Sequence, residues 1–176
     1  HVPSAIPTIS ENTVIPGNGG ISPAERSQRC KEIFDPYHRE ISSYLDNREA
    51  KGLETVLISI HSFTPVFKSV PRPWDIGLLY NRDDRLAGPI HEALEAMGDL
   101  VVGDNEPYAV SDETDYTIPV HGEGRGIHHM MFEIRQDLIA EESGQDLWSQ
   151  RLERVLTEAC KAVLKGPQRN RTGPAF

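Results

Sequence analysis

Long apolar runs are missing from this 176-residue sequence: none approaches the ~20 residues that a helix needs to cross a bilayer. Residues 1–20 also lack the basic start and the apolar core of a secretory signal peptide. Basic side chains are in the minority, with 18 Lys and Arg against 27 Asp and Glu and a formal net charge of −9. Nucleic acids and anionic membranes attract basic surfaces, so this balance disfavours both as partners.

Cysteine is scarce as well. Cys30 and Cys160 are far apart in the sequence, and both lie in helix-like stretches. We therefore expect two free thiols, buried or half-buried, in preference to a disulfide. This usage suits a reducing compartment, and we predict a cytoplasmic protein.

The composition that remains is that of a globular chain. Hydrophobic residues make up 38% of the sequence and charged residues 26%, and the length suits a single domain. We expect that domain to span residues 1–166 and a tail to follow over 167–176. Residues 1–23 are rich in Pro and Gly and have no periodic apolar face, which is typical of irregular structure. We read this segment as the continuation of something on its N-terminal side, so the domain is expected to be N-terminally incomplete.

A clear helical pattern begins at Ser22. Ser22 suits an N-cap, Pro23 the first helical position and Glu25 the third, which together predict a capping box, and the helix should end near Gly52. The remaining patterns predict strands over 55–61, 73–80, 100–103 and 127–134 and helices over 84–97 and 137–165. Strands that alternate with helices indicate an α/β fold with a largely parallel sheet. The strand over 55–61 is apolar on both faces, as in a sheet that is covered on both sides.

Two of these strands end in groups capable of chemistry. In α/β sheets, ligands bind beyond the carboxyl ends of the strands, and His61 stands at such an end. Glu133 stands near the end of the strand over 127–134, flanked by apolar residues, where a carboxylate is costly to bury without a partner or a role. The structural alternatives are a hydrogen-bonded histidine at position 61 and an ion pair between Glu133 and Arg135. Together, the two strand ends favour a functional site.

Three further segments carry polar candidates. Residues 116–126 combine His121 with several glycines, which indicates an active-site loop or, alternatively, a mobile surface connection. Arg72 precedes a rigid Pro-Trp pair and is suited to clamp a carboxylate, unless it is a solvated surface residue. Asn105 and Glu106 belong to a loop that follows a short strand. Neither an H-x-x-E nor an H-x-x-x-H spacing occurs, so spacing alone does not define a complete zinc site.

Several long segments resemble one known family. They read, in chain order, IPGNGGISPAER, IFDPYH, SIHSFTPVFKSVPRPWDIGLLYNRD, VVGDNEPY and FEIRQDLI. In this set and order they resemble the N-formylglutamate amidohydrolase family, over about residues 5 to 160. The resemblance implies a phosphorylase/hydrolase-like fold, similar to that of the zinc carboxypeptidases: a three-layer α/β sandwich with a mixed, largely parallel sheet covered by helices. It also implies zinc-dependent hydrolysis of N-formylglutamate to formate and glutamate, a step of histidine degradation.

The resemblance assigns roles to single residues. His61 is similar in position to the last zinc ligand of the family and Glu133 to its general base. His121 is expected to contact the substrate or its oxyanion, and Arg72 and Arg135 to hold substrate carboxylates. The other zinc ligands of the family come from an N-terminal segment with an HA or HS motif, and we expect the given sequence to begin after that segment. We therefore expect the 176-residue chain alone to bind zinc weakly or not at all.

Other functions remain open at this point. The chain is alternatively a catalytically inactive family member that binds a small acid, or a metalloenzyme of the same fold that acts on another N-acyl amino acid. In each case the expected partner is a small molecule, and the sequence does not define an oligomeric state.

Overall fold

The computed structural model describes residues 5–10 and 12–164. The described part opens with a small antiparallel hairpin of β1 (Ile9–Ser10) and β2 (Thr13–Val14), followed by a 3-10 turn, η2 (Pro16–Asn18). The segment expected to be irregular therefore contains short regular pieces. The predicted tail over 167–176 lies outside the described residues.

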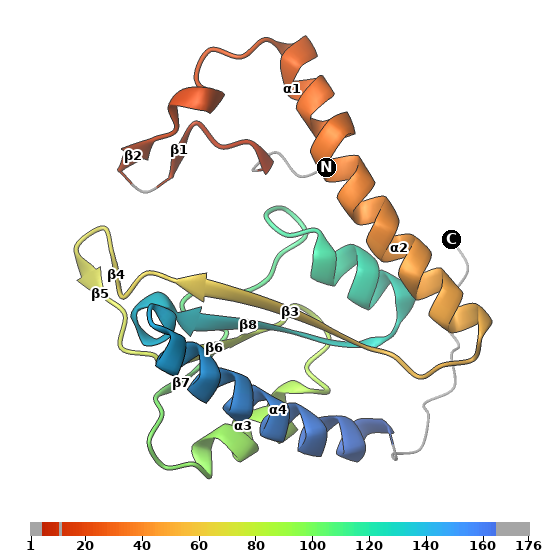
Figure 1. Ribbon diagram of the computed structural model, residues 1–176, viewed down its shortest axis with the longest axis vertical. Coiled ribbons are helices and arrows are strands. Elements are labelled where there is room, and N and C mark those ends of the chain that lie inside the picture. The colour runs from red at the N-terminus through yellow and green to blue at the C-terminus, as the bar shows by residue number, and fades with distance from the viewer. Residues whose placement is uncertain (1–4, 11, 165–176) are drawn as a thin grey trace.

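Four strands form the central sheet, in the order β3-β8-β6-β7 (Figure 1). Their bounds are β3 (Val56–Phe63), β8 (His128–Arg135), β6 (Ile76–Leu79) and β7 (Val102–Asp104). β3 runs parallel to β8 and β6 runs parallel to β7, whereas β6 and β8 are antiparallel. The sheet is therefore mixed and mostly parallel, which confirms the predicted fold class.

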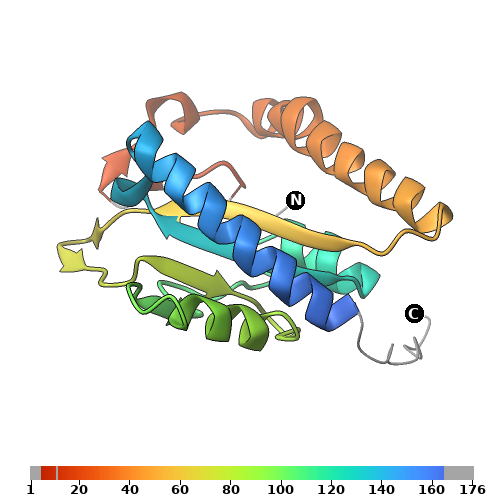
Figure 2. The same cartoon turned by 60° about the horizontal axis from the view of Figure 1, so that its bottom comes forward.

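Two helices cover one face of this sheet. They are α3 (Ala87–Glu95) and α4 (Glu142–Leu164), which contact each other and lie below β3 and β8 in Figure 1, while α4 crosses in front of these strands in Figure 2. Buried side chains of β6, β8, α3 and α4 form the main core; among them are Ile76, Leu78, Ile90, Leu94, Phe132 and Val155. Because every second residue of a strand points to the same face, Phe132 and Ile134 of β8 enter this core together.

The opposite face carries a smaller apolar cluster. It consists of Leu79, Val110, Ile118 and Met131. Ile118 belongs to a π-helical stretch, η4 (Thr117–Gly122), which contacts both β3 and β8. A 3-10 turn, η5 (Glu123–Arg125), follows it directly.

A long helical segment packs against η4 from the N-terminal side. It consists of α1 (Pro23–Arg29), a π-helical stretch η3 (Cys30–Phe34) and α2 (Asp35–Ala50). Ser22 caps it, since its hydroxyl accepts a hydrogen bond from the Glu25 backbone N–H. The Glu25 carboxylate accepts from Arg29 instead, so half of the predicted capping box is visible. α2 ends at Ala50, close to the predicted end near Gly52, and Gly52 itself has a left-handed φ of 64°.

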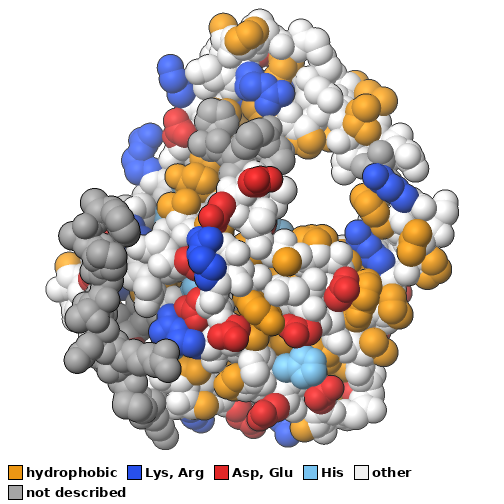
Figure 3. All heavy atoms as spheres, turned by 180° about the vertical axis from the view of Figure 1, so that it is seen from behind, with side chains coloured by type: hydrophobic (Ala, Val, Ile, Leu, Met, Phe, Trp, Pro, Cys, Tyr) orange, Lys and Arg blue, Asp and Glu red, His pale blue; other side chains and the backbone are white. Residues whose placement is uncertain are grey.

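Both cysteines are free thiols, which confirms the prediction that they form no disulfide. None of the described helices is long and apolar enough to cross a membrane. Seen from behind, the surface is hollowed between the N-terminal part at the top and the body below (Figure 3). Acidic and basic side chains of the described residues are interspersed over the lower half of this face.

Two predicted elements need correction. The last helix begins at Glu142 and not at 137, because Gln136–Ile139 form a separate 3-10 turn, η6. Gly144 allows the close junction between the two, since a Cβ at this position would lie 2.2 Å from the Leu138 carbonyl oxygen. The prediction that the strand over 55–61 is covered on both faces was wrong, because Ile60, which points to the α4 side, is 56% exposed. β3 lies at the edge of the sheet that the described residues form.

Candidate active site

His61 and Glu133 lie side by side near the carboxyl ends of two neighbouring parallel strands. They are paired residues in the register of β3 and β8, so their side chains share one face of the sheet. Ile60 and Ile134 precede and follow them and point to the α4 face instead. The prediction that two strand ends bring these groups to one rim describes their placement correctly.

The Glu133 carboxyl group is buried and only partly satisfied. The residue is 2% exposed, and its Oε1 accepts a hydrogen bond from the Tyr108 hydroxyl. Its Oε2 has no hydrogen-bond partner among the described residues. Burial raises the pKa of Glu133, while the Tyr108 hydroxyl and the charges of His61 and Arg72 act in the opposite direction. The carboxylate therefore keeps one oxygen free for a proton.

A pair of glycines brings Tyr108 to this carboxylate. Gly77 of β6 and Gly103 of β7 are register partners, and Gly77 also lies opposite Glu133. A Cβ at Gly77 would lie 2.0 Å from the Glu106 carbonyl oxygen, and one at Gly103 would lie 2.8 Å from the Glu106 Cβ. The loop that carries Glu106 thus runs directly over the sheet. Asn105 and Glu106 of this loop were candidates from the sequence and Tyr108 was not; Gly77 and Gly103 were the signal that could have pointed to it.

His61 is more accessible than its neighbour. It is exposed, and its Nε2 lies 3.0 Å from the Ser59 hydroxyl on the same face of β3. No other hydrogen bond to its ring is found among the described residues. The imidazole is therefore free to bind a further group with its other nitrogen.

Arg72 supplies a cation close to this pair. It follows a small hairpin of β4 (Val66–Phe67) and β5 (Val70–Pro71). Its guanidinium group stacks over Phe67, with 4.5 Å to the ring centroid, and a longer bond of 3.5 Å joins it to the Thr64 hydroxyl. No carboxylate of the described residues forms an ion pair with it, so its charge is available to an anionic ligand.

Arg135, by contrast, is already paired. Its guanidinium group lies 3.0 Å from Asp75 and 2.8 Å from Asp137, and it also donates to the Trp74 carbonyl oxygen. These contacts fasten the end of β8 to the start of β6. The alternative that Glu133 serves as the partner of Arg135 is not what the structure shows.

The structure places His121 in a separate group of side chains. His121 is 3% exposed, and its Nε2 lies 3.1 Å from Nδ1 of His38 on α2. Tyr116 packs against both rings. The next residue, Gly122, lies against the ring of His129 at the start of β8, four residues before Glu133. Burial lowers the pKa of both His38 and His121, and the structure does not bring His121 into contact with Glu133.

The predicted active-site loop over 116–126 is in fact two helical turns tied to the fold. Glu123 accepts hydrogen bonds from two backbone N–H groups of the 82–83 segment and pairs with Arg82 at 2.7 Å. Arg125 pairs with Asp46 of α2 at 2.6 Å. The polar residues of this segment hold elements together, and the segment is helical where the sequence predicted a loop.

The residues in place do not complete a zinc site. Among the described residues, no three His, Cys, Asp or Glu side chains are grouped so that they could hold a metal ion. Zinc in a catalytic site takes three protein ligands and keeps one open position. His61 alone does not meet that need.

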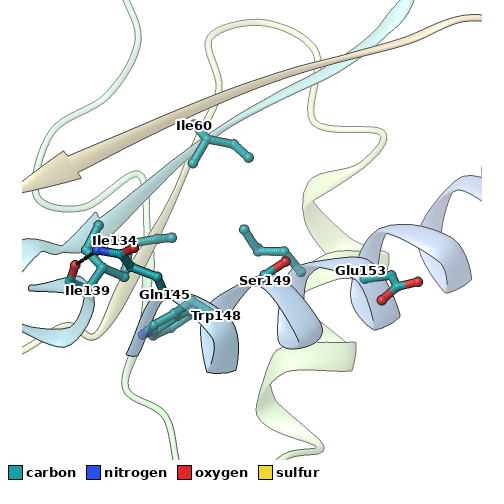
Figure 4. Close-up of a pocket in the computed structure, with 8 residues that line it drawn as sticks. Ile60, Ile134, Ile139, Gln145, Trp148, Ser149 and Glu153 are labelled. Carbon is teal, nitrogen blue, oxygen red and sulfur yellow. Dashed lines mark hydrogen bonds between the residues drawn. The ribbon is translucent and has the colours of Figure 1, made fainter. Parts of the chain in front are cut away.

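An open groove of about 440 Å³ lies on the other face of the sheet (Figure 4). Ile60 and Ile134 border it on the strand side, and Trp148, Ser149 and Glu153 project toward it from α4. Because these strand residues point away from His61 and Glu133, the groove is not part of the candidate site.

Comparison with known proteins decides the family. Residues 1–140 match the sequence model of the N-formylglutamate amidohydrolase family. The chain belongs to this family. It is also similar to the crystal structure of gene product Atu2144 from Agrobacterium tumefaciens, with a TM-score of 0.87 and 36% identity over 93% of this chain and 64% of that one. No match is found among curated proteins.

A second solved structure shares the fold. It is N-formylglutamate amidohydrolase from Ralstonia eutropha JMP134, with a TM-score of 0.57 and 18% identity. The match covers 81% of this chain and 56% of that protein. The chain therefore spans less than two thirds of the length of either solved structure.

Proposed function

We propose that the protein hydrolyses the amide bond of an N-acyl amino acid, with N-formylglutamate as the substrate and formate and glutamate as the products. Family membership supports an amidohydrolase. The observation that carries the proposal is the buried carboxyl group of Glu133, which lies beside His61 and keeps one oxygen without a partner among the described residues.

Glu133 is suited to the role of general base. Desolvation raises the pKa of its carboxyl group, so its carboxylate is a stronger base than one in water. In the proposed reaction, Oε2 takes a proton from the attacking water and returns it to the departing amine. Burial also limits competing solvent, which helps to keep that proton on the reaction path.

Arg72 is suited to hold the substrate. Its guanidinium group lies on the Phe67 ring and has no carboxylate partner among the described residues. A planar guanidinium held in this way can bind a substrate carboxylate through two hydrogen bonds. We no longer assign this role to Arg135, because Asp75 and Asp137 already neutralise it, nor do we assign His121 to the substrate.

Zinc is part of the proposal as the expected cofactor. His61 is the residue that we propose as a ligand, and a complete site needs donors that the described residues do not bring together. For this reason we derive no step of the reaction from zinc. We further propose a cytoplasmic location and a place in histidine degradation; the two free cysteines are compatible with a reducing compartment.

Formate release tests this function. The full gene product that carries this chain is incubated with N-formylglutamate, and formate is measured with and without a chelator and after zinc is added back. N-formylaspartate and N-acetylglutamate serve as matched substrates that change one end of the molecule at a time. We expect zinc-dependent formate release with N-formylglutamate; its absence at all zinc concentrations would contradict the proposal.

A small-acid binding protein is the second candidate. Two observations favour it: the described residues include no group of three metal-ligating side chains, and Arg72 has no carboxylate partner among them. Thermal unfolding with glutamate or N-formylglutamate, in the absence of zinc, separates the two functions. A rise in Tm without formate release would favour binding over catalysis.

A further inference from the structure

Tyr108 is the one side chain of the described residues that bonds to the Glu133 carboxyl group. It reaches this position because Asn105, with a left-handed φ of 52°, turns the chain back over the sheet. The Asn105 backbone N–H donates to Leu78 and its side-chain oxygen accepts from the Tyr80 backbone, so the turn is fixed to β6 at two points. The turn that leads to the tyrosine is therefore held by the sheet.

The two glycines beneath this loop reinforce that placement. Gly77 and Gly103 leave space for the Glu106 backbone, which lies closer to the sheet than any side chain would allow. A residue with a Cβ at Gly77 would lift the loop away from β6, and Tyr108 with it. Gly77, the register partner of Glu133, thus has no side chain where the loop that carries Tyr108 passes over the sheet.

The hydrogen bond distinguishes the two oxygens of the carboxylate. A glutamate side chain rotates easily about its last torsion, so a carboxylate without partners does not hold either oxygen in one place. The Tyr108 hydroxyl occupies Oε1, and Oε2 stays without a partner among the described residues. One oxygen is held while the other remains free to take a proton.

We propose that Tyr108 is a positioning residue for Glu133, which fixes Oε1 so that Oε2 faces the reacting water. This inference rests on the proposed function, in which Glu133 is the general base. Tyr108 acts through the carboxylate and not on the substrate, so its loss should affect turnover more than substrate binding. Outer partners of metal ligands typically contribute about 10–100-fold to activity, and we expect a loss of the same order for this carboxylate.

A double-mutant cycle tests the proposal in the full gene product. Tyr108→Phe keeps the ring and removes the hydroxyl, and we expect kcat to fall by roughly 10–100-fold with KM nearly unchanged. In the Glu133→Gln background, the same change should have almost no further effect, because the group that it positions is gone. Equal losses in both backgrounds, or a rise in KM alone, would overturn the proposal.

Tyr44→Phe is the matched control. Tyr44 lies on α2 and is 62% exposed. Loss of its hydroxyl should leave kcat unchanged. If both Tyr→Phe variants lowered kcat to the same degree, a general effect of losing a phenol would explain the result and the proposal would fail.

A crystal structure of Tyr108→Phe tests the positioning role of Tyr108 independently of the proposed function. If the wild-type protein releases no formate, the proposed function fails, but the position of the Glu133 carboxylate in the variant still reports on Tyr108. We expect the carboxylate to rotate or to occupy more than one conformation. An unchanged, single conformation would refute the positioning role whatever the activity.

Discussion

Replacing Glu133 by glutamine separates catalysis from structure at the candidate site. Glutamine has the same shape, and its amide oxygen can still accept the hydrogen bond from Tyr108. The amide nitrogen would then stand where Oε2 is free, and it cannot take a proton from water. If Glu133 is the general base, we expect kcat to fall by about 10²–10⁴-fold. That loss corresponds to about 2.7–5.4 kcal/mol in the activation barrier.

The stability of the Glu133→Gln variant should not fall together with its kcat. Arg135 keeps its partners Asp75 and Asp137, so the substitution leaves no buried cation without a counter-charge. Burial raises the pKa of Glu133 above its ordinary value of 4.5, so the folded protein holds this proton more tightly than the unfolded chain does. The stability contributed by the protonated form is full below pH 4.5 and is lost as the pH rises through the folded-state pKa. Glutamine does not ionise, and Glu133→Gln should therefore be as stable as the wild type at pH 7, or more stable.

Two measurements on the full gene product decide between the roles. Formate release is expressed per folded molecule, and urea unfolding is followed at pH 4.5 and at pH 7. Glu153→Gln, on the exposed side of α4, is the matched control for loss of a negative charge. A folded Glu133→Gln protein with near-normal formate release would refute the catalytic role. A clear loss of stability at pH 7 would refute the reasoning from the raised pKa.

Three further substitutions follow from the geometry. In the full gene product, His61→Ala should remove zinc and formate release together. The 176-residue chain alone should hold well under one zinc per chain by mass spectrometry. Full zinc in the variant or in the 176-residue chain would contradict the assignment of His61 as one ligand of an incomplete set. Gly77→Ala places a Cβ 2.0 Å from the Glu106 carbonyl oxygen and should lower the free energy of unfolding by about 1–3 kcal/mol, measured in urea. Its control, Gly88→Ala, meets no atom within 4 Å and should be nearly neutral; equal losses in both would refute the close approach. Glu123→Ala leaves two backbone N–H groups without their acceptor and should lower the free energy of unfolding by about 1–3 kcal/mol. Formate release per folded molecule should stay the same; a selective loss of activity would indicate that Glu123 belongs to the active site.

The strands could be predicted from the sequence because they form short apolar runs. These runs placed β3 and β8 and put His61 and Glu133 near strand ends at one rim, where the structure has them as register partners. The edge position of β3 could not be read in the same way. A strand of apolar residues looks alike at the centre and at the edge of a sheet, and only pairing distinguishes the two.

The segment over 116–126 shows where local pattern fails. Glycine, proline and threonine favour turns over helices, and the sequence accordingly predicted a loop. Its helical turns are stabilised by distant residues: Ile118 packs with Met131, and Glu123 binds the 82–83 backbone. Tyr108 was missed for a similar reason, since the hydroxyl meets a carboxylate 25 residues away. Contacts of this kind leave no periodic trace in the sequence.

The contrast between Glu133 and Arg135 supports a role for the former beyond packing. The two residues stand two positions apart on the same face of β8, so both face similar surroundings. Arg135 has two carboxylates and a carbonyl oxygen as partners, which shows that this part of the fold can satisfy a charge fully. Glu133 is more deeply buried; among the described residues its Oε1 has the Tyr108 hydroxyl as a partner and its Oε2 has no hydrogen-bond partner. An incompletely satisfied buried carboxyl group lowers stability, so its presence at a strand end beside His61 and Arg72 is better explained by chemistry at that oxygen than by the needs of the fold.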